Sequence, residues 1–355
     1  MMTIKLIEPA DQSVTRPLQR YTWPVDDTLH RDRGSQGGGQ DPIQWNNLRA
    51  ERVDLSEPAG VLFSWAPIAP LNNNLSYDLR ISRQKNFREA LLLKDLTESR
   101  VEVLHLHIAT RYYWKVRAHE NGVRLMDSPV QSFVTHDTPP RWISVPGITN
   151  VRDLGGWPLP GGRRVRQGML YRSSEMNSHL TITEEGKVLL MDSLGIRTDL
   201  DLRSPPEEVR PVLDPARVEW INVPIQPYDA ICVPECMPAY RQLFTIFADA
   251  SKYPILFHCW GGADRAGTVA FLLSALLGKD LDHLVKDYEL TSLSIWGERS
   301  QRSGEFQRLR AALASFDDGS GSVNSQAERY LHSIGVTRAE IGTIRELLIE
   351  PDHAS

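Results

Sequence analysis

The hydrophobic pattern of this 355-residue sequence changes its period at the paired prolines of Asp137-Thr-Pro-Pro-Arg141. Before that point, apolar and polar residues alternate in short runs, as in β-strands. Beyond it, strand-like runs alternate with helix-like ones. Proline fixes φ and lacks a backbone donor, so two in succession interrupt both helix and sheet. The change predicts two domains joined by a linker over residues 138–146, which suits a length above that of most single domains.

The N-terminal half is expected to be all-β. The runs VLFSWAP, YDLRISR, RYYWKVRAHENG and VQSFVTHD are rich in β-branched and aromatic residues and are separated by Pro, Asn and Gly. They predict an antiparallel β-sandwich over residues 51–137, and their arrangement resembles a fibronectin type III domain of the immunoglobulin-like class. Residues 1–50 are expected to form an N-terminal extension, in which 28–50 make a polar, glycine-rich surface loop.

The C-terminal half predicts an α/β domain over residues 147–350. Strands are expected in IRTDLDLRS, VEWINVP and YPILFH, and helices in TITEEGKVLLMDSLG, AYRQLFTIFADA, TVAFLLSALLG, QAERYLHSIG and TRAEIGTIRELLIE. Thr181 with Glu184, and Thr337 with Glu340, have the spacing of capping boxes. Strands that alternate with helices favour a parallel sheet with helices on both faces.

Between YPILFH and TVAFLLSALLG lies the segment His258-Cys-Trp-Gly-Gly-Ala-Asp-Arg-Ala-Gly-Thr268. A strand, a glycine-bearing loop and a helix direct several backbone N–H groups and a helix N-terminus at one point, which suits an anion such as phosphate. Arg265 can bind two phosphate oxygens with its planar guanidinium. Cys259 would lie beneath the anion, where the same groups stabilise its thiolate and make it a nucleophile.

The segment HCWGGADRAG resembles the His-Cys-x5-Arg signature of cysteine-dependent tyrosine and dual-specificity phosphatases, above all a bacterial tyrosine/lipid phosphatase branch. GITNVRDLGGWPLPGGRRVRQGMLYRSSEM (147–176) is similar to the Asn-x-Arg-Asp-x-Gly-Gly motif of that branch. DLDLRSPPEE and YLHSIGVTRAEIGTIRELLIE are similar to its later segments. The resemblance covers residues 147–350. It implies hydrolysis of phosphomonoesters through a phosphocysteine on Cys259, without metal or cofactor.

The same resemblance implies roles for further residues. The phosphate cradle would consist of Trp260, Gly261, Gly262, Ala263, Asp264 and Arg265. The supporting residues would be Asn150, Arg152 and Asp153, which buttress the loop, Arg172, which adds positive potential, and His258, which orients the loop and tunes the thiol.

Two loop positions depart from the pattern of that branch. Ala263 stands where the branch has Lys, which removes a positive charge and weakens the case for highly phosphorylated inositol lipids. Ala266 stands where the branch has a hydroxyl that helps the thiolate leave. Losing a hydrogen bond to a charged group costs on the order of 1.5–3 kcal/mol, enough to slow breakdown of the intermediate by about tenfold or more. Thr268 is expected to point elsewhere on its helix.

An aspartic acid is expected to give a proton to the leaving group. Asp264 lies inside the loop, where the branch usually has Asp. Asp229 follows the strand VEWINVP, where many phosphatases carry a mobile acid. The sequence supports these two equally. Asp201, at the end of another expected strand, is a third candidate.

Composition narrows the class of partner. A net charge of -5 gives no reason to expect nucleic-acid binding. No apolar stretch approaches the roughly 18 residues of a membrane span, and the first residues lack a signal-peptide core. With only three cysteines, the sequence favours a reducing, cytoplasmic location. Cys232 and Cys236 lack the second ligand pair of a usual zinc site.

Phosphotyrosine is the first substrate expected, and a phosphoinositide or another phosphomonoester stays open. Ala263 and Ala266 support a second hypothesis, a phosphate-binding pseudophosphatase. A rhodanese-like sulfur transferase also begins its loop with Cys, but the segment NVRDLGG disfavours it. The N-terminal sandwich is the expected site for any protein partner.

Overall fold

The computed structural model describes residues 3–21, 54–68, 74–205 and 209–351. The polar loop expected over residues 28–50 lies outside them. The chain divides into two compact units, one of residues 1–19 and 58–141, the other of residues 20–57 and 142–355. The first unit therefore includes residues that the sequence assigned to a separate extension. The second includes residues 54–57, which the sequence assigned to the sandwich.

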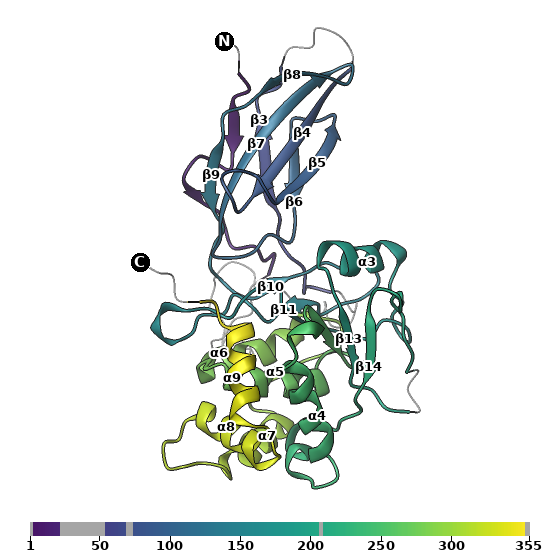
Figure 1. Cartoon of the computed structure of the whole chain (residues 1–355), viewed down its shortest axis with the longest axis vertical. Coiled ribbons are helices and arrows are strands. Elements are labelled where there is room, and N and C mark those ends of the chain that lie inside the picture. Colours follow the sequence, from purple (N-terminus) through teal and green to yellow (C-terminus); the bar gives the residue numbers. More distant parts are fainter. Residues whose placement is uncertain (1–2, 22–53, 69–73, 206–208, 352–355) are drawn as a thin grey trace, which may run out of the picture. The chain divides into compact units, whose positions relative to one another are not determined.

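The first unit contains two β-sheets (Figure 1). The smaller sheet has the order β1-β3-β6, with β1 (Leu6–Glu8), β3 (Val61–Trp65) and β6 (Arg100–Val103). The larger sheet has the order β2-β9-β7-β4-β5, with β8 beside β7. Its strands are β2 (Ser13–Val14), β4 (Leu75–Ser82), β5 (Ala90–Leu96), β7 (Arg111–Glu120), β8 (Val123–Asp127) and β9 (Gln131–Val134).

Aromatic side chains join the two sheets of this unit. Phe63 of β3 lies edge to face against Trp114 of β7, with 5.1 Å between ring centroids, and against Phe133 of β9, at 5.5 Å. All three side chains are fully buried. Along β7, buried and partly exposed residues alternate, as a strand with one face in the core requires. Each of the four runs singled out in the sequence contains a strand, whereas β5, β6 and β8 were not expected.

The second unit is built on a six-stranded sheet of order β10-β11-β12-β15-β13-β14. Its strands are β10 (Arg141–Trp142), β11 (Arg152–Asp153), β12 (Leu170–Ser173), β13 (Thr198–Asp201), β14 (Glu219–Asn222) and β15 (Ile255–His258). The last four pair in parallel, and β11 pairs antiparallel with β12. The three strands expected from the sequence are therefore neighbours in a parallel core, to which β12 adds a fourth.

Successive residues of the central strand β15 enter different hydrophobic cores. Ile255 and Phe257 pack with the larger group of helices, whereas Leu256 packs with the α3 segment on the opposite face. The larger group consists of α4 (Met237–Phe247), α5 (Arg265–Leu276), α6 (Leu281–Glu289), α7 (Gly304–Ala314), α8 (Val323–Ser333) and α9 (Arg338–Leu348) (Figure 1). The other face is covered by α3 (Glu184–Val188) and the π-turn η2 (Leu189–Ser193). Helices thus lie on both faces of the sheet.

Two details of the expected helices differ at their starts. The cap of α3 is Thr183, not Thr181, because the Thr183 side chain accepts the N–H of Gly186. The capping box of Thr337 and Glu340 is confirmed at the start of α9. Short 3-10 turns connect the remaining elements: η1 (Pro160–Gly162), η3 (Tyr228–Cys232), η4 (Ala250–Lys252) and η5 (Leu290–Leu293). Within the ranges that the structure describes, no helix has the length and apolar character needed to cross a membrane.

Candidate active site

The loop of residues 259–264 joins the carboxyl end of β15 to the first residue of α5. Cys259 opens the loop and is 2% exposed, and Arg265 begins the helix. β15 is held between β12 and β13, so the position of the loop is fixed by a buried, fully paired strand. In open α/β sheets, ligands bind outside the carboxyl ends of the strands, where helix N-termini attract anions.

Three successive carbonyls of the loop accept hydrogen bonds from groups outside it. Trp260 accepts from the N–H of Glu175 (2.9 Å), Gly261 from the amide of Asn150 (2.9 Å), and Gly262 from the guanidinium of Arg172 (2.5 Å). In a trans peptide, the C=O and N–H groups point in opposite directions. The three following N–H groups, of Gly261, Gly262 and Ala263, therefore each point away from the partner of the preceding carbonyl.

Gly262 is required by the conformation of the loop. Its φ is +65°, in the left-handed region that favours glycine. A Cβ added to it would lie 2.3 Å from the carbonyl oxygen of Ser173, which belongs to β12. The loop therefore approaches the sheet more closely than any other residue at this position would allow.

A buried ion network supports the loop from behind. Arg152 of β11 and Arg172 of β12 are both fully buried, and each binds one carboxylate oxygen of Asp287 in α6, at 2.9 and 2.8 Å. Burial raises the pKa of Asp287, but the charges of Arg152 and Arg172 outweigh it and hold that pKa well below its ordinary range. Arg172 therefore donates hydrogen bonds to loop carbonyls and forms an ion pair with Asp287. The sequence had predicted that it would add positive potential at the site.

Arg152 and Asp153 do not form a surface ion pair, since both are fully buried. Arg152 binds Asp287. The carboxylate oxygens of Asp153 accept the N–H groups of Gly155 and Gly168, each at 2.7 Å. The motif Asn-Val-Arg-Asp-Leu-Gly-Gly thus supplies buried polar side chains that hold backbone in place.

His258 ends β15 and is 1% exposed. Its Nε2 lies 3.0 Å from the carboxylate of Asp199 and its Nδ1 3.9 Å from that of Asp201, without the alignment of a hydrogen bond. Burial lowers the pKa of His258, but the two carboxylates outweigh it and raise that pKa above its ordinary value of 6.5. Asp201 also binds Arg203 at 2.8 Å, so its carboxylate is paired with a buried guanidinium.

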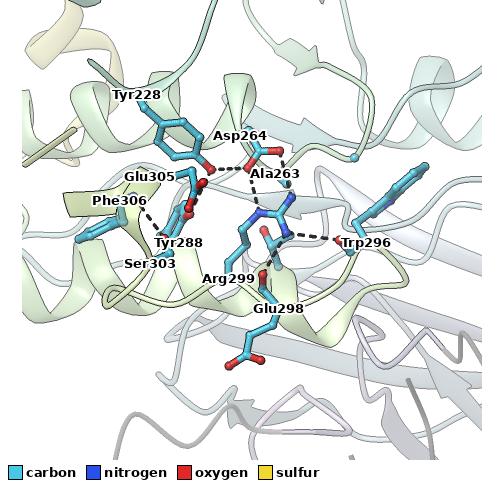
Figure 2. A network of polar contacts seen from close by, with 12 residues as sticks. Tyr228, Ala263, Asp264, Tyr288, Trp296, Glu298, Arg299, Ser303, Glu305 and Phe306 are labelled. Atoms are coloured by element: carbon cyan, nitrogen blue, oxygen red, sulfur yellow. Dashed lines mark hydrogen bonds and ion pairs between the residues drawn. The ribbon is translucent and has the colours of Figure 1, made fainter. Parts of the chain in front are cut away.

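Asp264, the last residue of the loop, is bound through both carboxylate oxygens (Figure 2). Arg299 donates from Nε to Oδ1 at 2.9 Å and from Nη2 to Oδ2 at 3.0 Å, and the hydroxyl of Tyr228 donates to Oδ1. Burial and the charge of Asp264 raise the pKa of Tyr228, which keeps its phenol protonated. Both carboxylate oxygens of Asp264 are thus engaged by neighbouring donors.

Tyr228 is held in an unusual backbone conformation. Its φ of +62° is rare for a bulky residue, and such strain persists where the surroundings fix it. Its N–H donates to Oγ1 of Thr268 at 2.9 Å, and that hydroxyl donates to the carbonyl of Asp264 at 2.9 Å. Thr268 therefore links η3 to the start of α5. The hydroxyl of Thr268 is thus engaged with two backbone groups. This agrees with the expectation that it points away from the place of the hydroxyl that Ala266 lacks.

Asp229, the other expected acid, follows Tyr228 in η3 and faces α7. Its carboxylate lies 3.3 Å from Nε of Arg308, and both side chains are 53% exposed. Its charge also raises the pKa of Cys232, after the larger effect of burial. The structure therefore holds one candidate acid, Asp264, in the loop and the other against a neighbouring helix.

A pocket of about 440 Å³ opens beside Asp264. It is lined by Pro227, Tyr228, Asp264, Tyr288, Glu298, Arg299, Ser303 and Glu305. Three carboxylates and one guanidinium give this wall a negative balance, which disfavours a polyanionic ligand. A larger pocket of about 570 Å³ lies at the other end of α5, among residues such as Leu276 and Arg345, and is separate from the loop.

The tryptophan of the loop contributes an aromatic surface. The ring of Trp260 is partly exposed and lies 4.1 Å from that of His179, measured between centroids. Ala263 and Ala266 are buried, at 2% and 0% exposed. Within the described ranges, no group of three or more His, Cys, Asp or Glu side chains is placed to hold a metal ion.

Several contacting residues were not found by sequence reasoning. Arg299 and Trp296 come from the segment between η5 and α7, whose sequence SIWGERSQRSG has no helix or strand period. The Trp296 ring lies against Gly261, because a Cβ added there would be 2.9 Å from it. The acid of the network, Asp287, was missed with the whole of α6. The available signal was the helical spacing of the apolar residues Leu284, Val285 and Tyr288, beside which Asp287 lies.

The family model named "Tyrosine phosphatase family" matches residues 143–350, more than half of the chain. The chain belongs to this family. A provisionally named tyrosine-protein phosphatase of Cupriavidus necator is 31% identical over 193 residues, which are 46% of this chain and 65% of that protein. A tyrosine-protein phosphatase of Nostoc commune is 24% identical over 201 residues, 43% of this chain and 66% of that protein. The matches span slightly less than two thirds of each relative.

Two solved structures resemble parts of this family member. The core catalytic domain of the PP-IP phosphatase SIW14 from S. cerevisiae, in complex with citrate, matches 49% of this chain and 96% of its own, with 16% identity and a TM-score of 0.31. A fibronectin type III domain derived from the human KIAA0970 protein matches 30% of this chain and 90% of its own, with 22% identity and a TM-score of 0.20. Both scores are too low to support an argument.

Proposed function

We propose that this protein hydrolyses phosphomonoesters through a phosphocysteine intermediate on Cys259. The observation that carries the proposal is that groups outside the loop hold the carbonyls of Trp260, Gly261 and Gly262, so that each following N–H group is fixed and points away from these partners. Donors fixed in this way bind an anion without reorganisation when charge develops in the transition state. Cys259 and Arg265, at the two ends of the same loop, supply the nucleophile and a bidentate phosphate ligand.

The reaction proceeds in two displacements. The Cys259 thiolate attacks phosphorus, the S–P bond forms, and the bond from phosphorus to the leaving oxygen breaks while an acid protonates that oxygen. Water then attacks phosphorus and gives a proton to the carboxylate that the first step left deprotonated, the S–P bond breaks, and phosphate leaves with the thiolate restored. Fixed N–H donors and Arg265 stabilise the equatorial oxygens in both steps.

Asp264 is the proton donor in this proposal. It lies in the loop, whereas Asp229 contacts Arg308 on α7. Its ion pair with Arg299 has to open before a proton is transferred, so substrate binding and release of Asp264 are coupled. Asp201, bound to Arg203, is not a candidate in this mechanism.

The substrate class that fits best is an aryl phosphate such as phosphotyrosine. The partly exposed ring of Trp260 beside His179 offers a surface on which an aromatic ring can stack. The negative wall at Asp264, Glu298 and Glu305 disfavours the additional phosphates of a phosphoinositide. Both features therefore favour a phosphotyrosine-bearing protein over a phosphoinositide. The dual specificity expected from the sequence is an extension of the proposal that neither feature addresses.

We further propose that the two units are separate domains, and that the first is fibronectin type III-like and binds a protein partner. Supporting this, its two sheets enclose Phe63, Trp114 and Phe133 from three of the expected strands. A cytoplasmic location stays a prediction from cysteine usage.

The test is phosphate release from p-nitrophenyl phosphate in the presence of EDTA, with wild-type protein and Cys259→Ser compared across pH 5–8. Turnover that survives the chelator and disappears in Cys259→Ser supports the proposal. If neither protein releases phosphate while both bind inorganic phosphate, the pseudophosphatase hypothesis replaces it. Ala266, which lacks the hydroxyl expected to help the thiolate leave, is the feature that favours this alternative.

A further inference from the structure

Residues 54–57 form a short segment of the second unit that lies outside the family match, which begins at residue 143. Leu55 is 4% exposed and belongs to the main core of that unit, and its N–H donates to the carbonyl of Leu293 at 2.7 Å. Ser56 is also 4% exposed. Two buried residues and a short backbone hydrogen bond show that the segment is docked on the unit that carries the loop.

The hydroxyl of Ser56 has its donor and acceptor roles assigned by its neighbours. It donates to Oδ1 of Asp54 at 2.5 Å, and the same oxygen accepts the N–H of Ser56 at 2.9 Å. A serine hydroxyl has one proton and two acceptor positions. With the proton directed to Asp54, Ser56 Oγ accepts the N–H of Asn150 at 3.1 Å, in a buried contact.

Asn150 transmits this contact to the loop. It is fully buried and its φ is +58°, a left-handed conformation that asparagine tolerates better than most residues. Its Nδ2 donates to the carbonyl of Gly261 at 2.9 Å and lies 3.3 Å from Oγ1 of Thr291. The backbone that Ser56 holds therefore carries the side chain that holds Gly261.

The chain of contacts ends at a donor of the cradle. Because Asn150 holds the carbonyl of Gly261, the N–H of Gly262 in the same peptide points the other way. We propose that Ser56 is a positioning residue for the phosphate loop, acting through Asn150 on the Gly261–Gly262 peptide. The inference rests on the proposed function only in taking phosphate as the ligand of the loop.

Ser56, which positions the loop in this proposal, belongs to the segment that leads into the first unit. Glu57 is the last residue of the second unit before the chain passes into the first unit at Pro58. The family match contains Asn150 and Gly261 but not Ser56 or Asp54. A serine from outside the matched region thus completes the hydrogen bonding of a residue inside it.

The experiment compares full-length Ser56→Ala, Ser56→Thr and Ser82→Ala with wild type. Ser82 is the matched control, since it is 2% exposed and its hydroxyl donates to the carbonyl of Glu89 and accepts the N–H of Gln84, in the first unit. The readouts are the Kd for inorganic phosphate, kcat and KM on p-nitrophenyl phosphate, and the thermal midpoint. We expect Ser56→Ala to weaken phosphate binding about tenfold, the effect of about 1.4 kcal/mol. Ser56→Thr, which keeps the hydroxyl, and Ser82→Ala should retain the wild-type Kd.

A folded Ser56→Ala protein with the wild-type phosphate Kd would overturn the inference. If that variant does not fold, Asp54→Ala decides, because it removes the oxygen that accepts the Ser56 proton. Weaker phosphate binding by Asp54→Ala supports the inference, and an unchanged Kd overturns it. Wild-type protein that binds phosphate without turnover contradicts the proposed hydrolysis alone, and the Kd comparison still tests Ser56. Wild-type protein that does not bind phosphate contradicts both.

Discussion

The guanidinium of Arg299 binds both carboxylate oxygens of Asp264, at 2.9 and 3.0 Å, although 35 residues separate them in sequence. Ala263 leaves the loop without the lysine expected beside Asp264, and Arg299 brings a cation to that place from another segment. Because the two charges cancel, the Arg299–Asp264 pair itself adds no net positive charge to the end of the loop. A bidentate pair also fixes the direction of the carboxylate.

Replacing Arg299 with Met should lower the thermal midpoint of the second unit by about 3 °C, the effect of about 1 kcal/mol in a domain of this size. The pair is only partly buried, with side chains 21% and 39% exposed, so a larger loss is not expected. The midpoint of Arg299→Lys should fall by more than half of the drop seen in Arg299→Met, because lysine donates from a single nitrogen. Differential scanning calorimetry gives the measurement. Arg308→Met is the control, since it removes a 53% exposed pair with Asp229 and should shift the midpoint by less than about 1 °C.

Asp264→Asn should reduce turnover of phosphotyrosine by about 100-fold and of p-nitrophenyl phosphate by less than about tenfold. The reason is that nitrophenolate leaves without full protonation, whereas the tyrosine phenolate needs a proton from the acid. Asp229→Asn should leave the ratio of the two rates at its wild-type value, because its carboxylate faces α7. Steady-state kinetics on both substrates give the ratios. An equal loss on both substrates in Asp264→Asn would mean that Asp264 only positions the loop.

The strand, loop and helix around Cys259 were predictable because their signals are local. A buried apolar run, two glycines and an apolar helix define the start and end of the loop without knowledge of distant contacts. The cap of α9 was predictable for the same reason, since Thr337 and Glu340 lie within one turn. The capping box predicted at Thr181 and Glu184 was wrong, because Thr183 is the cap of α3 and the residue three positions after it, Gly186, has no side chain to complete a box.

Asn150 was predicted to support the loop, but three other residues of its surroundings were not predictable, because they depend on long-range packing. Arg299, Asp287 and Ser56 lie in three segments that only the tertiary fold brings to the loop. Arg172 was expected to add positive potential, but its burial directs it to Asp287 and the Gly262 carbonyl. A charged residue in a sequence pattern does not reveal whether its charge is free or neutralised by a buried partner.

Gly262→Ala should abolish phosphate binding and strongly destabilise the second unit. The new Cβ would lie 2.3 Å from the Ser173 carbonyl in addition to requiring a φ of +65°. Gly161→Ala separates the two effects, because Gly161 has a φ of +78° and no atom within 4 Å of an added Cβ. Gly161→Ala should cost about 1 kcal/mol and leave phosphate affinity unchanged. Urea unfolding measures the free energy of unfolding, and titration measures phosphate affinity. Similar losses in the two variants would show that the positive φ alone causes the effect, without the clash with Ser173.

The stability of the second unit should fall as the pH rises above about 6.5, because of His258. Its pKa is raised in the folded state, where burial opposes and the carboxylates of Asp199 and Asp201 favour the charged ring. Below about 6.5 the ring is protonated in both states, and the full stabilisation is present. As the pH rises toward the folded pKa, the unfolded chain loses this proton first, so the free energy of unfolding decreases.

Urea unfolding from pH 5.5 to 9 should show this decrease in wild type and not in His258→Gln. His332→Gln, at a partly exposed position in α8, should keep the wild-type slope, and a slope that persists in His258→Gln would assign the pH dependence to another group.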